Sequence, residues 1–164
     1  MTKQKDDKRA KVIAALNEAR AMELQAIYQY MNHHYSLDDW DYGTLAVKMK
    51  KIAIDEMRHA EQFAERIKDI NGNAGSEPIG KITHGHTIDN LYPFDAAAEE
   101  DTIERYNALM IECRESGDSV SATLFEKIIN EEQDHFNYFD NTATHIKELK
   151  TSFLAKAAGT ASDD

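Results

Sequence analysis

Two short motifs in the sequence each place a glutamate and a histidine three residues apart. The first motif is Glu56 with His59, and the second is Glu132 with His135. An α-helix turns once every 3.6 residues, so each pair shares one helical face and can bind a metal ion through a carboxylate and an imidazole. A single pair of this kind is common by chance on a solvated helix, and its surroundings therefore decide its meaning.

Apolar residues recur with helical periodicity around both motifs. Those expected on the motif faces are Met49, Ile52, Phe63 and Ile67 in the first segment and Phe125, Ile128, Phe139 and Ile146 in the second. We therefore expect both Glu–His pairs to point into a core. Buried carboxylates and imidazoles are costly without partners, so such a core usually binds a metal ion or contains a complete hydrogen-bond network.

Two further glutamates complete a repeated pattern. Glu23 precedes Glu56 by 33 residues, and Glu99 precedes Glu132 by the same interval. The chain is thus predicted to contain two helical hairpins, each supplying a glutamate and then a Glu-x-x-His motif. This combination builds carboxylate-bridged di-iron or di-manganese centres in four-helix bundles. Carboxylates and imidazoles without a thiolate also favour iron or manganese over softer metals.

Length and composition limit the possible classes of protein. A chain of 164 residues is the size of one domain, and its net charge of −11 argues against nucleic acid or an anionic membrane as partner. The charge suits attraction of cations. No apolar segment is long enough to span a bilayer, and the polar first ten residues do not resemble a signal peptide, so we expect a cytoplasmic protein. The single cysteine, Cys113, is expected in the core.

The hydrophobic pattern predicts an all-α fold with four long helices and a short fifth helix. The expected helices cover about 8–35, 42–71, 95–116, 118–150 and 151–158. The first four would form a bundle over about 8–150 with a turn at 36–40, and a polar tail at 159–164 would complete a single domain, 1–164.

The connection between the second and third helices is too long for a tight turn. In a bundle, a connection of about twenty residues is a crossover that lets the third helix run parallel to the second. Asp95 is the expected N-cap of the third helix, and Asp118 that of the fourth, after a helix end at Gly117.

Three segments closely resemble the bacterioferritins. They are residues 22–30 (MELQAIYQY), 54–61 (IDEMRHAE) and 130–135 (NEEQDH). The resemblance extends from about Lys11 to the end of the fourth helix, nearly the whole chain. It implies a ferritin-like four-helix bundle with a long crossover between helices two and three and a short fifth helix that closes cages.

The resemblance also implies a function, which is iron storage and detoxification. A ferroxidase would oxidise Fe(II) to Fe(III) with O2 or peroxide at a di-iron centre inside each subunit. The ferric iron would be stored as mineral inside a cage of 24 identical subunits built from dimers, and a small redox protein is a possible electron donor. The implied iron ligands are Glu23, Glu56, His59, Glu99, Glu132 and His135.

Two further residues gain roles from the resemblance. Met57 points about 100° away from the metal face, and position alone favours a surface or interface methionine. In bacterioferritins the matching methionine, from two subunits, binds one haem at the dimer interface. Tyr30 matches a tyrosine beside the di-iron centre, which implies a catalytic role as a radical or as a hydrogen-bond donor. A tyrosine simply packed in the core is an equal alternative.

Several other residues are weaker candidates for a functional site. His33, His34 and His145 are expected at the surface or an interface, and packing accounts for Trp40. His84 and His86 in the crossover are expected in an exposed loop, the alternative being a metal site on the outer surface.

The sequence departs from the family pattern at one position, and it leaves two rival functions open. Some bacterioferritins have an extra inner-surface iron site, for which this chain has Asp55 but has Lys51 where those proteins have histidine. One rival is a rubrerythrin-like di-iron peroxidase or oxidase without storage, disfavoured because no Cys-x-x-Cys pairs are present. The other is a non-enzymatic haem protein for electron transfer or metal buffering.

Overall fold

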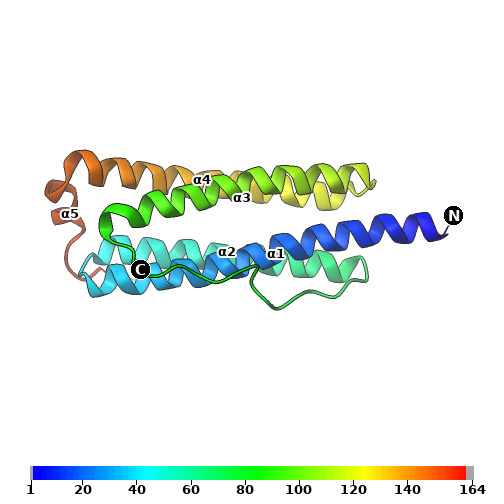
Figure 1. The fold of residues 1–164 in the computed structure, drawn as a ribbon, viewed down its shortest axis with the longest axis horizontal. Helices are drawn as coiled ribbons and strands as arrows, with labels where there is room; N and C mark the ends of the chain where they lie inside the picture. The colour runs from blue at the N-terminus through cyan, green and yellow to red at the C-terminus, as the bar shows by residue number, and fades with distance from the viewer. Residues whose placement is uncertain (1, 162–164) are drawn as a thin grey trace.

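Four long helices lie side by side in the computed structural model, which describes residues 2–161 (Figure 1). The first hairpin consists of α1 (Thr2–Asp39) and α2 (Gly43–Asp69). The second consists of α3 (Ile88–Glu115) and α4 (Ser119–Leu149). The hairpins pack against each other through α1 with α3 and α2 with α4. The predicted all-α four-helix bundle is confirmed.

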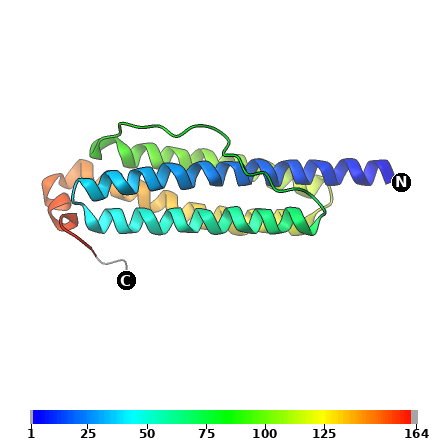
Figure 2. The ribbon, with the colours of Figure 1, turned by 90° about the horizontal axis from the view of Figure 1, so that it is seen from below.

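The crossover between α2 and α3 follows α1 along the side of the bundle (Figures 1 and 2). Backbone and side-chain hydrogen bonds hold it there, including Ile79 N to Ala21 O at 2.9 Å and Thr83 N to Gln29 Oε1 at 2.8 Å. The chain is thereby returned to the end of the bundle where α2 began. As a result α3 runs parallel to α2, as predicted.

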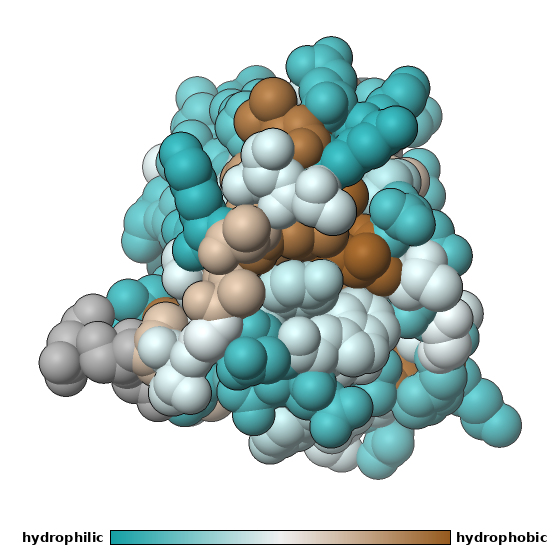
Figure 3. Space-filling model, turned by 90° about the vertical axis from the view of Figure 1, so that its left-hand side faces the viewer, coloured by the Kyte–Doolittle hydropathy of each residue, from teal (hydrophilic) through white to brown (hydrophobic). Residues whose placement is uncertain are grey.

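A short helix, α5 (Thr151–Ala157), closes one end of the bundle after a reversal at Lys150, where φ is 49°. Figure 3 shows this end, with apolar side chains bordered by hydrophilic ones. The chain then passes close to the start of α2, where Gly43 N donates to Gly159 O at 3.0 Å. A Cβ at position 43 would lie 2.2 Å from that carbonyl oxygen, so the approach requires glycine. Residues 162–164 of the predicted polar tail lie outside the described residues.

The first helix is longer than predicted at both ends. Its first turns are polar and project beyond the bundle, so no hydrophobic pattern marks them (Figure 2). At the other end the predicted turn at 36–40 is wrong, because α1 continues to Asp39 and buries Leu37 completely. Core packing of Leu37 stabilises the additional turn.

The predicted start of the third helix at Asp95 is also wrong, since α3 begins at Ile88. Thr87 is the N-cap in a capping box with Asn90, and Thr87 N donates to Asn90 Oδ1 at 2.7 Å. Pro93 lies inside this helix as its sixth residue, where its missing N–H removes one helical hydrogen bond. In contrast, Asp118 caps α4 as predicted, accepting a bond from Ser121 N at 2.9 Å.

The core has three layers along the bundle axis. One apolar cluster includes Leu37, Met49 and Phe139, and a second includes Phe63 and Phe125. On each of the four helices, the residues of the first cluster are separated from those of the second by the predicted metal ligands. A polar layer therefore lies between two apolar ones.

The burial of individual residues agrees with the sequence pattern. All eight apolar residues expected beside the two motifs are buried, and Cys113 is in the core. Burial, followed by the charge of Asp118, raises the pKa of the Cys113 thiol to about 12, so the thiol stays protonated at neutral pH. Among the helices of residues 2–161, none combines the length and apolarity needed to cross a membrane.

Candidate di-metal site

The polar layer brings together all six residues that the sequence pattern singled out. Each long helix contributes to it, and all six side chains are buried. The residues are Glu23 from α1, Glu56 and His59 from α2, Glu99 from α3, and Glu132 and His135 from α4.

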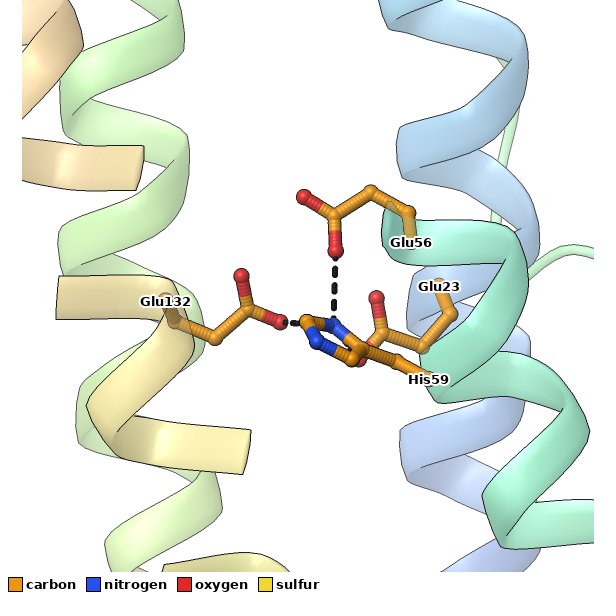
Figure 4. A group of neighbouring side chains, drawn as sticks. All are labelled: Glu23, Glu56, His59 and Glu132. Atoms are coloured by element: carbon orange, nitrogen blue, oxygen red, sulfur yellow. Dashed lines mark hydrogen bonds and ion pairs between the residues drawn. The ribbon is translucent and has the colours of Figure 1, made fainter. Parts of the chain in front are cut away.

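The six side chains form two overlapping groups of possible metal ligands. Within each group one ligand atom from every residue lies within 4.8 Å of the others. The groups are Glu23, Glu56, His59 and Glu132 (Figure 4), and Glu56, Glu99, Glu132 and His135. Two glutamates belong to both groups, whereas each group has one glutamate and one histidine of its own. Two neighbouring four-ligand positions that share two carboxylates are thus present.

The surroundings of His59 show why a cation suits the first position. Its Nδ1 lies 2.9 Å from Glu56 Oε2, 3.1 Å from Glu132 Oε1 and 3.7 Å from Glu23 Oε1 (Figure 4). A ring nitrogen carries at most one hydrogen and cannot donate a good bond to three carboxylates. A metal ion among these atoms would accept the nitrogen lone pair and all three carboxylates.

The second position shows the same convergence. Nδ1 of His135 lies 3.0 Å from Glu132 Oε2 and 2.9 Å from Glu56 Oε1. Only the contact with Glu132 has hydrogen-bond geometry, and Glu56 Oε1 is buried without a hydrogen-bond partner. A buried carboxylate oxygen that lacks a donor fits a metal ligand, and the donor set fits iron or manganese.

In the metal-free site, raised pKa values favour protonated side chains, which reduces the negative charge of the four carboxylates. Burial raises the pKa of Glu23 and Glu99, and the charges of Glu132 and Glu56 raise it further. Burial lowers the pKa of both histidines, but their close contacts with the carboxylates of Glu132 and Glu56 outweigh it and raise the pKa to about 10 for His59 and about 11 for His135. Protons thus occupy the place of cations, and metal binding must release them.

A second carboxylate contacts the far nitrogen of each histidine. Nε2 of His59 lies 2.8 Å from Glu131 Oε2, and Nε2 of His135 lies 3.5 Å from Asp55 Oδ2. A carboxylate at Nε2 favours a hydrogen on that nitrogen, which leaves the Nδ1 lone pair for a metal. Sequence reasoning missed this function of Asp55 and Glu131. The available signal was that an acidic residue directly precedes each motif glutamate, at the same repeat of 76 residues.

Two tyrosines hold the unshared glutamates from the opposite hairpin. The Tyr30 hydroxyl on α1 donates to Glu99 Oε1, and the Tyr106 hydroxyl on α3 donates to Glu23 Oε1 at 2.6 Å. Burial raises the pKa of both hydroxyls, as do nearby acidic groups, so both tyrosines keep their protons. Tyr30 therefore contacts the site directly, whereas Met57 is 55% exposed on another face of α2.

The histidines outside the site differ from one another. His33 is not at the surface as predicted, because the crossover and α3 cover it and leave it 1% exposed. His86 is not a freely exposed loop residue either, since its Nδ1 lies 3.0 Å from His33 Nε2. His34 is half-buried and contacts Ala46 O at 2.8 Å. The exposed positions predicted for His84 and His145 are correct, and Trp40 packs partly buried against the core.

The fold and its core of carboxylates and histidines define a ferritin-like protein. The Ferritin family model, described as a ferritin-like domain, matches residues 13–149. More narrowly, the chain belongs to the bacterioferritin family. It is 55% identical to the bacterioferritin of Desulfovibrio desulfuricans over 162 residues, which is 99% of this chain and 90% of that protein. It is 36% identical to bacterioferritin BfrA of Mycobacterium tuberculosis over 84% of this chain and 87% of that protein.

Solved structures give the same family. The crystal structure of D. desulfuricans bacterioferritin, described with its diiron site in different catalytic states, has a TM-score of 0.96 and 54% identity. That comparison covers 98% of this chain and 94% of the other. Rhodobacter capsulatus bacterioferritin, described with a metal-free dinuclear site and haem iron, has a TM-score of 0.86 and 30% identity over 94% of this chain and 97% of that one.

Proposed function

We propose that this chain is a ferroxidase that oxidises Fe(II) with O2 or peroxide and stores the ferric product. The observation that carries the proposal is the pair of buried four-ligand positions sharing Glu56 and Glu132. Two Fe(II) ions bound side by side can each give one electron to one oxidant molecule. Anionic ligands also stabilise Fe(III) more than Fe(II), because the ferric ion carries the larger charge.

The residues have distinct roles in this proposal. Glu23 and His59 bind one iron, Glu99 and His135 bind the other, and the two shared glutamates bridge them. Glu131 and Asp55 orient the two histidines through Nε2. Tyr30 and Tyr106 hold the unshared glutamates and supply hydrogen bonds as the site changes charge.

Storage requires an enclosed space, which we propose is a cage of 24 chains built from dimers. Surface features that support association are the exposed Tyr28 and Tyr35 on α1 and a groove of about 920 Å³ between α3, α4 and α5. Phe136 and Leu154 line this groove with other apolar residues. The net charge of −11 suits the concentration of iron inside such a cage.

Haem is proposed at the dimer interface, held by Met57 from each of two chains. The residue fits this role because its thioether is exposed on the surface of α2, where a second chain can approach. When bound, the haem would supply one-electron transfer to the stored iron. Met57→Leu should abolish the Soret band of protein produced with adequate haem, while Met31→Leu on α1 should keep it.

Size-exclusion chromatography with light scattering tests storage directly. The protein is first loaded aerobically with excess Fe(II), and protein, ferric iron and Soret absorbance are measured in one eluting peak. A particle of about two dozen chains with far more than two irons each is expected. A dimer with about two irons per chain would instead indicate a di-iron oxidase or peroxidase without storage. Cytoplasmic location and a redox-protein electron donor remain predictions.

A further inference from the structure

A second buried cluster of titratable side chains lies outside the six-residue site. It consists of Asp95 on α3, His33 on α1 and His86 in the crossover. Asp95 Oδ2 lies 2.9 Å from His33 Nδ1, and His33 Nε2 lies 3.0 Å from His86 Nδ1. Asp95 and His33 are buried, whereas His86 is partly exposed. Phe94 packs against both imidazole rings, with centroids at 6.0 Å from His33 and 4.4 Å from His86.

The amide of Gln29 fixes which nitrogen of His33 accepts a proton. Its Oε1 accepts from Thr83 N at 2.8 Å and its Nε2 donates to Thr83 O at 2.9 Å, so the amide orientation is determined. The same Nε2 lies 2.9 Å from His33 Nε2, which must therefore be the acceptor. His33 consequently has its hydrogen on Nδ1 and donates it to Asp95. His33 thus accepts on the side of the crossover surface and donates toward the interior of the bundle.

The inner end of the line lies one helical turn from a residue of the di-metal site. Asp95 Oδ1 is buried and has no hydrogen-bond partner. Asp95 lies four residues before Glu99, one turn along the same face of α3. The Tyr30 hydroxyl, which bonds to Glu99, has a pKa raised mainly by burial and further by the charges of Glu99 and Asp95.

The internal repeat shows that this line is not a general requirement of the fold. The repeat of 76 residues that relates the two halves pairs Asp95 with Ala19 and His33 with Leu109. Ala19 and Leu109 are both buried in an apolar cluster. Among the described residues, polar side chains thus occupy two positions beside one half of the site where apolar side chains occupy the equivalent positions beside the other half.

We propose that His86, His33 and Asp95 form a proton relay between the surface of the crossover and the di-metal site. The inference rests on the proposed ferroxidase function. Two Fe(II) ions release two electrons, which reduce O2 to hydrogen peroxide or hydrogen peroxide to two waters. Either reaction consumes two protons, and these must enter a buried site.

The relay balances protons at every step. A proton from solvent binds His86 at Nε2 while its Nδ1 hydrogen moves to His33 Nε2. The Nδ1 hydrogen of His33 then moves to Asp95 Oδ2, and the Asp95 carboxyl gives its proton to the reduced oxygen species formed from the oxidant. Each imidazole then carries its hydrogen on the other nitrogen, and both rings exchange it back before the second proton passes. Burial raises the pKa of Asp95 to about 6, so its carboxyl can exchange a proton near neutral pH. Burial lowers the pKa of His86, which favours release of its proton to His33.

Replacement of His86 by alanine, with and without added imidazole, tests the relay. His86→Ala should slow Fe(II) oxidation at least about tenfold, in line with the usual contribution of a positioned proton donor. Added imidazole should restore the rate of this variant and leave the parent protein unchanged. His84→Ala in the same loop is the matched control and should oxidise iron at the parental rate. Co(II) titration should give two ions per chain in all three proteins.

Two outcomes would overturn the relay. One is a His86→Ala variant as fast as the parent, and the other is a slow variant that imidazole does not rescue, which would indicate a structural role for His86. Failure of the ferroxidase proposal itself appears differently, because the unaltered parent would then bind two Co(II) without accelerating Fe(II) oxidation.

Discussion

One half of the site contains Glu23 and His59, and the other contains Glu99 and His135. The two halves are close copies, but their surroundings differ. Each half supplies a glutamate held by a tyrosine from the other hairpin, and a histidine held at Nε2 by a carboxylate. The half with His59 is backed by the apolar Ala19 and Leu109, while the half with His135 is followed by a line of polar side chains. The internal repeat therefore explains why two candidate metal positions are present, and the different surroundings are the feature in which the two halves depart from each other.

The largest effect is expected from a change that affects both halves. Glu56→Ala removes a carboxylate common to both metal positions, so Fe(II) oxidation should fall to the rate measured without protein. Glu23→Ala or Glu99→Ala should instead abolish only one position, and Co(II) titration should give one ion per chain. Glu61→Ala, an exposed glutamate on the same helix, is the control and should behave like the parent. Parental oxidation by Glu56→Ala would contradict the shared-ligand role.

A smaller effect should distinguish the two carboxylates that orient the histidines. Such partners typically contribute 10–100-fold, as an order of magnitude, to metal affinity. Glu131 is 2.8 Å from His59 Nε2, whereas Asp55 is 3.5 Å from His135 Nε2. Glu131→Gln should therefore weaken Co(II) binding more than Asp55→Asn, and competition titrations with a chelator would measure both. The reverse order would show that the contact distances do not determine how firmly each histidine is held.

The pH dependence should separate the metal-free protein from the loaded one. In the metal-free site the pKa values of about 10 for His59 and about 11 for His135 exceed the ordinary value of 6.5. Their contribution to stability is complete below about pH 6.5, declines above it, and is lost as pH passes 10 to 11. The metal-free chain should thus unfold at lower denaturant concentration at pH 9 than at pH 7. Co(II)-loaded protein should not show this decline, because the bound metal requires deprotonated histidines.

The sequence predicted which six side chains converge because these residues follow two regularities at once. Helical spacing placed Glu56 with His59, and the repeat of 76 residues placed Glu132 with His135 in the equivalent position. Helix ends were less predictable, since they depend on the core packing of Leu37 and on a capping box at Thr87. Local patterns do not include the position of a crossover relative to another helix.

The burial of His33 was unpredictable for that reason. Its partners Asp95 and His86 come from α3 and from the crossover, more than fifty residues away in the sequence. Neither has a regular spacing relative to His33. The only signal available was negative, in that the repeat has Leu109 at the position equivalent to His33 and Ala19 at that of Asp95.

The smallest expected difference concerns the two tyrosines, and it tests the asymmetry most directly. Tyr30→Phe and Tyr106→Phe each remove one hydroxyl that donates to an unshared glutamate, so each should destabilise the metal-free protein by about 1–3 kcal/mol. Their effects on oxidation should differ, because Asp95 lies one helical turn before Glu99, the partner of Tyr30, whereas Ala19 lies one turn before Glu23, the partner of Tyr106. Tyr30→Phe should slow oxidation severalfold in stopped-flow measurements, and Tyr106→Phe should leave the rate close to that of the parent. Equal slowing by both variants would show that the tyrosines act only by holding the glutamates, and that the two halves are equivalent in function despite their different surroundings.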